Sequence, residues 1–168
     1  MPTGRLDGWT APKDIILWVA GQLGVAGGTN AIVEYISPGA CTISATGKAT
    51  IANMGAELGA TTSVFSYDDR MGRYLAATDR AAFVPIIERW TELLAPDAEV
   101  EAAPYTHYDK VLKLNLSELQ PHIVGPHSPD RARPLADMAA EIADDANGFE
   151  DIVSSALIGS CTNSSYEV

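Results

Sequence analysis

Two polar side chains, Asn53 and Glu57, stand in a segment made mostly of Ala, Gly and Met. Their spacing of four residues places them on one face of a helix. Burying an amide and a carboxylate there would cost free energy unless both found partners. The spacing alone therefore leaves two interpretations open: a solvated stripe at the end of a helix, or two polar groups that line a cleft.

A second candidate for chemistry is Cys161, near the end of the sequence. The apolar run from Ile152 to Ile158 predicts a buried strand, and Gly159 predicts a tight turn before a helix start. Ligands and catalytic residues of α/β sheets gather at the carboxyl ends of strands. Backbone N–H groups and the helix dipole would stabilise a thiolate there. A reactive or metal-binding thiol and an inert buried thiol are both compatible with this pattern.

The elements that would position Asn53 and Glu57 follow from the flanking sequence. Residues 51–65 predict the end of a small-residue helix, a stop at Gly59 and a strand from Thr61 to Phe65. Upstream, Thr10 and Pro12 predict the start of an amphipathic helix that carries Ile15, Ile16, Val19, Ala20 and Leu23, followed by a strand from Ala31 to Ser37.

Downstream, the oxygens of residues 66–69 predict the cap of a further helix. We next expect a helix from Phe83 to Leu94, with its aromatic residues in the core, and then a solvated loop from Pro96 to Pro104. A strand from His107 to Leu116 and a short helix from Pro134 to Ala146 should follow.

Composition limits the classes of partner. The chain has 168 residues, a net charge of −11 and 46% apolar residues, which suits one domain or one domain with the start of another. The sequence contains no cluster of Lys and Arg, which argues against nucleic acid and against an anionic membrane. It also contains no signal core and no run long enough to span a bilayer.

The cysteines and histidines form no complete metal-binding pattern of their own. Cys41 and Cys161 are far apart, and no Cys-x-x-Cys occurs. The three histidines, His107, His122 and His127, lack a matching carboxylate or cysteine pattern. We expect two reduced thiols and no histidine metal site.

Two segments carry a resemblance to a known family. Residues 157–167, Leu-Ile-Gly-Ser-Cys-Thr-Asn-Ser-Ser-Tyr-Glu, resemble the first cluster-cysteine motif of the aconitase family, and residues 53–65 resemble a second segment of the same enzymes. Residues 8–14, 31–35 and 114–119 agree with the family too. The match covers nearly the whole chain and is weakest across residues 95–106. The sequence Gly-Ala-Glu-Leu-Gly-Ala-Thr-Thr at residues 55–62 resembles aconitase more than the homoaconitase and isopropylmalate isomerase branches of the family.

The resemblance implies a hydro-lyase, an aconitate hydratase, that interconverts citrate and isocitrate through cis-aconitate. Such enzymes hold a [4Fe–4S] cluster on three cysteines, and its open iron acts as a Lewis acid. Cys161 matches the first cluster ligand, and Glu57 matches a catalytic carboxylate near the iron-bound hydroxyl or water. Asn53 and Asn163 match the neighbourhood of substrate and cluster, while Cys41 falls outside the motifs. The implied location is the cytoplasm, or the mitochondrial matrix in a eukaryote.

The resemblance also implies a three-layer α/β/α fold with a short parallel or mixed sheet. Residues 1–133 would form the second domain of the family, and residues 134–168 would begin the following, cluster-binding domain. The sequence begins inside the family pattern, stops just after Cys161, and has Val168 where the family has Asp. We therefore expect a fragment that is inactive alone, because one thiolate cannot hold a [4Fe–4S] cluster. The alternative is a non-catalytic module that binds a partner chain.

Overall fold

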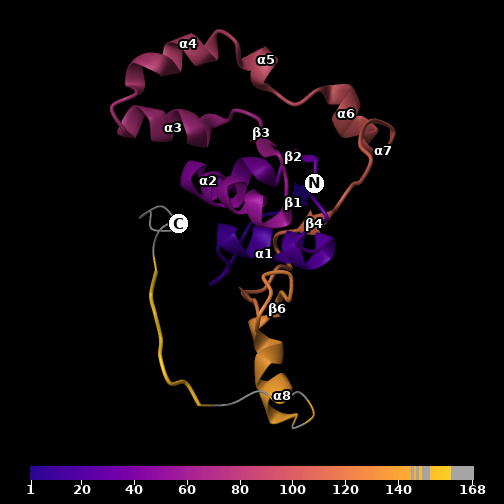
Figure 1. Ribbon diagram of the computed structural model, residues 1–168. Coiled ribbons are helices and arrows are strands. Elements are labelled where there is room, and N and C mark those ends of the chain that lie inside the picture. Colours follow the sequence, from indigo (N-terminus) through magenta and orange to yellow (C-terminus); the bar gives the residue numbers. More distant parts are fainter. Residues whose placement is uncertain (145, 147, 149–151, 160–168) are drawn as a thin grey trace.

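Two parallel strand pairs and two helices form the centre of the molecule (Figure 1). The computed structural model describes residues 1–144, 146, 148 and 152–159. The central elements, in chain order, are β1 (Pro2–Thr3), α1 (Pro12–Leu23), β2 (Ile32–Tyr35), the 3₁₀ helix η1 (Ala40–Thr42), α2 (Ala45–Met54), the 3₁₀ helix η2 (Gly55–Leu58), β3 (Thr62–Phe65) and β4 (Leu114–Asn115).

The strand pairs define the fold class. β2 and β3 run parallel over four residues, from Ile32 opposite Thr62 to Tyr35 opposite Phe65, and β1 pairs in parallel with β4. The Gly39 N–H donates to the backbone oxygen of Pro2 at 3.1 Å, which places β1 beside the chain that leaves β2. The predicted α/β fold with a short parallel sheet is confirmed.

The core lies between α1, α2 and the strands. Ile15, Ile16, Ile51, Leu58 and Leu116 are at most 1% exposed. The predicted small-residue helix is confirmed, and its composition explains the close packing of α1 on α2. A Cβ atom at Gly47 would lie 2.6 Å from Cγ of Pro12, so no larger residue fits at that point without a shift.

The start of α1 depends on Asp14. Its Oδ2 accepts a hydrogen bond from the Ala11 N–H at 2.7 Å, and its Oδ1 accepts one from the His122 N–H at 2.7 Å. Thr10, the expected cap, instead donates its hydroxyl to the Leu119 carbonyl at 3.0 Å. The prediction that Thr10 caps the helix is wrong, because the buried carboxylate of Asp14, four positions later, accepts from the N–H of Ala11, the residue before the helix, and also from β5 (His122–Ile123).

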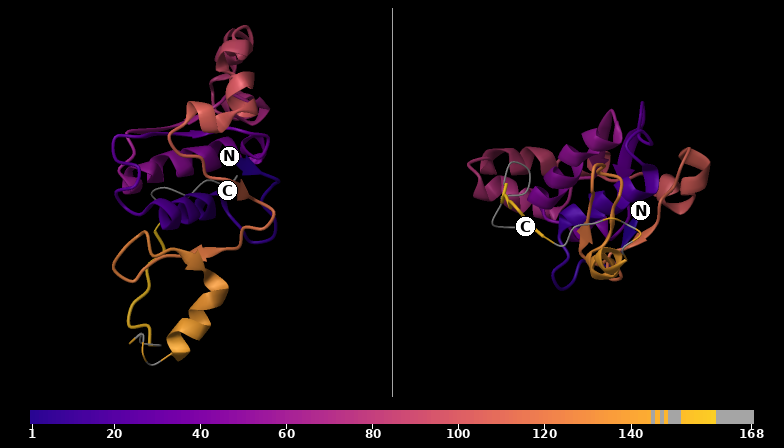
Figure 2. Two further views of the ribbon diagram at one scale, coloured as in Figure 1. Left: turned by 90° about the vertical axis from the view of Figure 1, so that its right-hand side faces the viewer. Right: turned by 60° about the horizontal axis from the view of Figure 1, so that its bottom comes forward.

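A curved arm of short helices extends from one side of the core (Figures 1 and 2). It contains α3 (Asp69–Ala77), η3 (Ala81–Phe83), α4 (Val84–Glu88), α5 (Thr91–Leu94), α6 (Ala98–Ala102) and α7 (Pro104–His107). The predicted cap of α3 is confirmed, since Oδ1 of Asp68 accepts from the N–H groups of Arg70 and Met71.

Two predictions for the arm are wrong. The single helix expected from Phe83 to Leu94 is interrupted between α4 and α5, and its aromatic residues lie outside the core: Phe83 is 57% exposed and Trp90 is 58% exposed. The arm stands away from the core, so its apolar residues have little to pack against. The expected loop from Pro96 to Pro104 contains the short helix α6.

Two predicted strands are largely absent from the described residues. Of residues 107–116, only Leu114 and Asn115 pair as a strand, and residues 104–107 form α7. Residues 152–158 are extended but unpaired, and Leu157 and Ile158 are almost completely exposed. Both sequences suit a strand, but a strand forms only where a neighbour supplies hydrogen bonds.

Below the core, β5 pairs in antiparallel fashion with β6 (Arg133–Pro134), and the 3₁₀ helix η4 (Leu135–Asp137) leads into α8 (Met138–Ala143). This confirms the short helix expected within residues 134–146. Among the described residues, no helix combines the length and the apolar character needed to cross a membrane.

Candidate functional site

Asn53 and Glu57 lie at the joint between α2 and η2. Asn53 is in the last turn of α2, Glu57 is in η2, and both side chains are exposed. The opposite face of the same joint is buried, with Met54 7% and Leu58 1% exposed. The apolar face therefore fixes the joint to the core and leaves the amide and the carboxylate on an open edge.

The chain after Glu57 is held equally firmly. Gly59 adopts a left-handed conformation with φ of +75°, which favours glycine and ends the helix. The Gly28 N–H donates to the Leu58 carbonyl at 2.9 Å, and the Thr61 N–H donates to the Ala31 carbonyl at 2.9 Å. These bonds connect the segment on either side of Gly59 to Gly28 and Ala31 in the loop that precedes β2, so the loop fixes the chain that follows Glu57.

The other two predicted site residues, Cys161 and Asn163, lie outside the described residues. The structure thus leaves both Asn53 and Glu57 exposed near the α2–η2 joint, and their relation to Cys161 stays a prediction. Within the described part of the chain, no group of three or more His, Cys, Asp and Glu side chains could hold a metal ion. Cys41 is exposed in η1.

A buried ion pair that the sequence did not predict joins α2 to the residue that caps α3. The ammonium of Lys48, on α2, bonds to Oδ2 of Asp68, and their side chains are only 3% and 11% exposed. The Lys48 Nζ also lies 5.8 Å from the ring centre of Phe65, which stacks on Tyr35. The sequence pattern that could have indicated this pair is a lysine, Lys48, within a predicted helix of small residues, followed by the capping aspartate Asp68.

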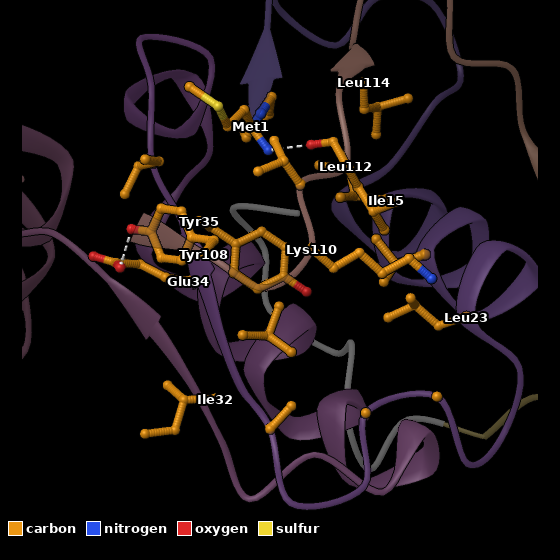
Figure 3. A pocket seen from close by; sticks show the side chains of 18 of the residues that line it. Met1, Ile15, Leu23, Ile32, Glu34, Tyr35, Tyr108, Lys110, Leu112 and Leu114 are labelled. Atoms are coloured by element: carbon orange, nitrogen blue, oxygen red, sulfur yellow. Dashed lines mark hydrogen bonds between the residues drawn. The ribbon is translucent and has the colours of Figure 1, made fainter. Parts of the chain in front are cut away.

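The clearest pocket is elsewhere, between β2 and the chain that leads to β4 (Figure 3). It has a volume of about 190 Å³. At its rim the Tyr108 hydroxyl donates to the Glu34 carboxylate. The pKa of Tyr108 is raised to about 12, mainly by burial and secondly by this hydrogen bond. A second, more open groove lies between α1 and β6. Neither pocket is lined by Asn53 or Glu57.

Comparison with known proteins identifies the class of this chain. The pattern of the aconitase family (aconitate hydratase) matches residues 2–168. The chain therefore belongs to the aconitase family.

The individual relatives carry the same name. The mitochondrial aconitate hydratase of Emericella nidulans is 52% identical over 165 residues, and that of Gracilaria gracilis is 50% identical over 165 residues. The probable mitochondrial aconitate hydratase of Caenorhabditis elegans is 50% identical over 167 residues. Each match covers 98% of this chain but only 20% of the relative, so the chain spans about a fifth of the length of the curated relatives it matches.

The family implies an iron–sulfur cluster, and the residues can be compared with that requirement. A cubane cluster needs several thiolate ligands, and the described residues contain one cysteine, the exposed Cys41. They therefore do not form a cluster site by themselves.

Proposed function

We propose that this chain forms one wall of the active site of an aconitate hydratase that interconverts citrate and isocitrate through cis-aconitate. The observation that carries the proposal is about 50% identity to aconitate hydratases along almost the entire chain. Residues 1–133 would be one domain and residues 134–168 the start of the next. The Glu57 edge would face the substrate, and the remaining walls would come from other domains of a longer polypeptide.

Glu57 is proposed as a proton donor and acceptor. Dehydration of citrate removes a proton from one carbon and a hydroxide from its neighbour. A carboxyl group beside the departing hydroxide can supply the proton that converts it into water, and in the reverse direction the carboxylate accepts a proton from water. This role requires a carboxylate that is accessible but fixed in place, which is how the α2–η2 joint presents Glu57.

The other predicted residues would bind and orient. Asn53, one helical turn before Glu57, can donate and accept hydrogen bonds toward substrate or cluster. We propose Cys161 as one ligand of a [4Fe–4S] cluster, with Asn163 in its neighbourhood. When bound, such a cluster supplies a Lewis acid for the substrate hydroxyl. The relatives quoted above are named mitochondrial, and in a eukaryote we propose the mitochondrial matrix as the location of this chain.

The isolated chain is expected to show no citrate–isocitrate turnover, even after anaerobic reconstitution with iron and sulfide. Its own thiols, two in the whole sequence, are too few for the three cluster ligands that the family uses. The measurement is the absorbance of cis-aconitate formed from citrate, with a full-length aconitate hydratase reconstituted in parallel as the positive control. Turnover above the rate of a reconstituted Cys161→Ser variant would contradict the proposed division of the site.

A further inference from the structure

Ser63, on β3, carries a buried hydroxyl that has no hydrogen-bond partner among the described residues. Its neighbours along the strand, Thr62 and Val64, are both exposed, so Ser63 lies on the inner face of β3. Nearly all buried hydroxyl groups in proteins are hydrogen-bonded, because an unpaired one lowers stability. Hydrogen bonding therefore does not explain a serine here, and its role must lie in the space that the hydroxyl fills.

The Ser63 hydroxyl points at Gly55, the first residue of η2. A Cβ atom at Gly55 would lie 2.7 Å from Oγ of Ser63 but 3.9 Å from its Cβ. The first distance is too short for two atoms of this size, whereas the second is an ordinary contact. Gly55 is buried, so its backbone packs directly on the hydroxyl with no room for a side chain between them.

This contact lies close to Glu57 along the chain. Gly55 comes two residues after Asn53 and two residues before Glu57. Both α2 and η2 pack against β3. The hydroxyl of Ser63 therefore limits how closely the α2–η2 joint approaches β3 at the turn that carries Glu57.

A second glycine, two residues after Glu57, makes a similar contact. A Cβ atom at Gly59 would lie 2.9 Å from Oγ1 of Thr29. That hydroxyl is fixed, because it donates to the Ala26 carbonyl at 2.8 Å. The Glu57 turn thus has a glycine packed on a hydroxyl at each end, one from β3 and one from the loop that precedes β2.

We propose that Gly55 and Ser63 are positioning residues for Glu57, and that the Ser63 hydroxyl is a spacer that fixes the distance between β3 and the α2–η2 joint. This inference rests on the catalytic role proposed for Glu57. A group that transfers a proton must lie within hydrogen-bond reach of its target, and a displacement of about 1 Å can lower a rate on the order of 10²-fold. A buried hydroxyl that weakens the fold is consistent with such a role, since departures from optimal packing gather at functional sites.

The test uses a chimera in which this chain replaces the matching 165 residues of the Emericella nidulans aconitate hydratase. Gly55→Ala places a methyl group against the Ser63 hydroxyl and should push the joint away from β3. We expect kcat and kcat/KM to fall together by at least about tenfold, at unchanged iron and sulfide content. Amide exchange at Ala60, whose N–H donates to the Gly55 carbonyl at 3.2 Å, should become faster.

Two further variants test the spacer itself. Ser63→Ala removes the hydroxyl without breaking a hydrogen bond, so the melting temperature should not fall, while kcat should fall by about threefold or more. The double variant with Gly55→Ala and Ser63→Ala exchanges the hydroxyl for a methyl group in nearly the same place. It should recover kcat to within about threefold of the parent chimera and restore the slow exchange at Ala60.

The matched control is Gly72→Ala on α3, where a Cβ atom would lie 2.5 Å from the Tyr67 hydroxyl. This is the same kind of contact in the arm, and the rate should stay within about twofold of the parent. In the Glu57→Gln background, Gly55→Ala should lower the rate by less than about twofold, because the group that it displaces no longer transfers a proton.

The outcomes separate this proposal from the role of Glu57. If Glu57→Gln lowers the rate but Gly55→Ala costs equally in both backgrounds, the contact does not act through Glu57 and only the positioning role is overturned. If Glu57→Gln leaves the rate unchanged, both proposals fail. A full rate for Ser63→Ala, no recovery in the double variant, or an equal loss for Gly72→Ala would also overturn the proposal. Should Gly55→Ala not fold, Ser63→Ala and the double variant still decide.

Discussion

Replacement of Glu57 by Gln should lower the rate of citrate–isocitrate conversion by about 10²- to 10⁴-fold, the usual contribution of a general acid–base group. The suitable host is a chimera in which this chain replaces the matching 165 residues of the Emericella nidulans enzyme. Gln keeps the size of Glu57 but carries no charge and cannot transfer a proton. Since Glu57 is exposed on a joint anchored by Met54 and Leu58, the fold should not change.

The matched control is Glu92→Gln, which removes one exposed carboxylate from α5 in the arm. Its rate should stay within about twofold of the parent chimera, and both variants should have its melting temperature. Equal rates for the two variants would remove Glu57 from the chemistry. A large loss of rate together with a fall in melting temperature for Glu57→Gln would make its role structural.

The largest effect on stability is expected at the buried pair of Lys48 and Asp68. Lys48→Met should lower the free energy of unfolding by about 3–5 kcal/mol, because it leaves the carboxylate of Asp68 without its buried partner. Asp68→Ala should cost at least as much, since it also removes the cap of α3. Urea denaturation followed by circular dichroism measures both changes.

Two controls distinguish the effect of an unpaired buried charge from a general loss of stability caused by any substitution. Glu141→Gln breaks a more exposed ion pair, in which the side chains of Glu141 and Arg133 are 30% and 18% exposed. This change should lower the free energy of unfolding by less than about 1 kcal/mol. The double variant with Lys48→Met and Asp68→Asn should recover most of the loss, because Asn still caps α3 and no unpaired charge remains. If Lys48→Met costs no more than Glu141→Gln, the pair is not the stabilising contact described above.

The features that the sequence predicted well depend on local chemistry. Gly59 ends the helix because few other residues adopt its conformation, and Asp68 caps α3 through its immediate neighbours. The Asn53–Glu57 spacing assumed one α-helix, whereas α2 ends at Met54 and Glu57 lies in the 3₁₀ helix η2, so their shared face stays a prediction. The buried ion pair was not predictable in the same way, since lysine is usually exposed, whereas the tertiary structure buries Lys48 beside Phe65 and Asp68.

The strand predictions that were wrong concern segments whose pairing depends on neighbouring strands, which the local sequence does not indicate. Residues 107–116 and 152–158 have strand-like patterns, yet pairing is limited to Leu114 and Asn115 among the described residues. For the arm, apolar periodicity around Trp90 predicted a buried face, but the described part of the chain leaves Trp90 more than half exposed.

The chimera itself, without further substitutions, tests the central claim most directly. If this chain forms one wall of an aconitate hydratase active site, the chimera should interconvert citrate and isocitrate within about tenfold of the Emericella nidulans enzyme, because about half of the residues are already the same. The rate should be compared at equal iron and sulfide content. A folded chimera that binds its cluster but is slower by a factor of a thousand or more would contradict the account.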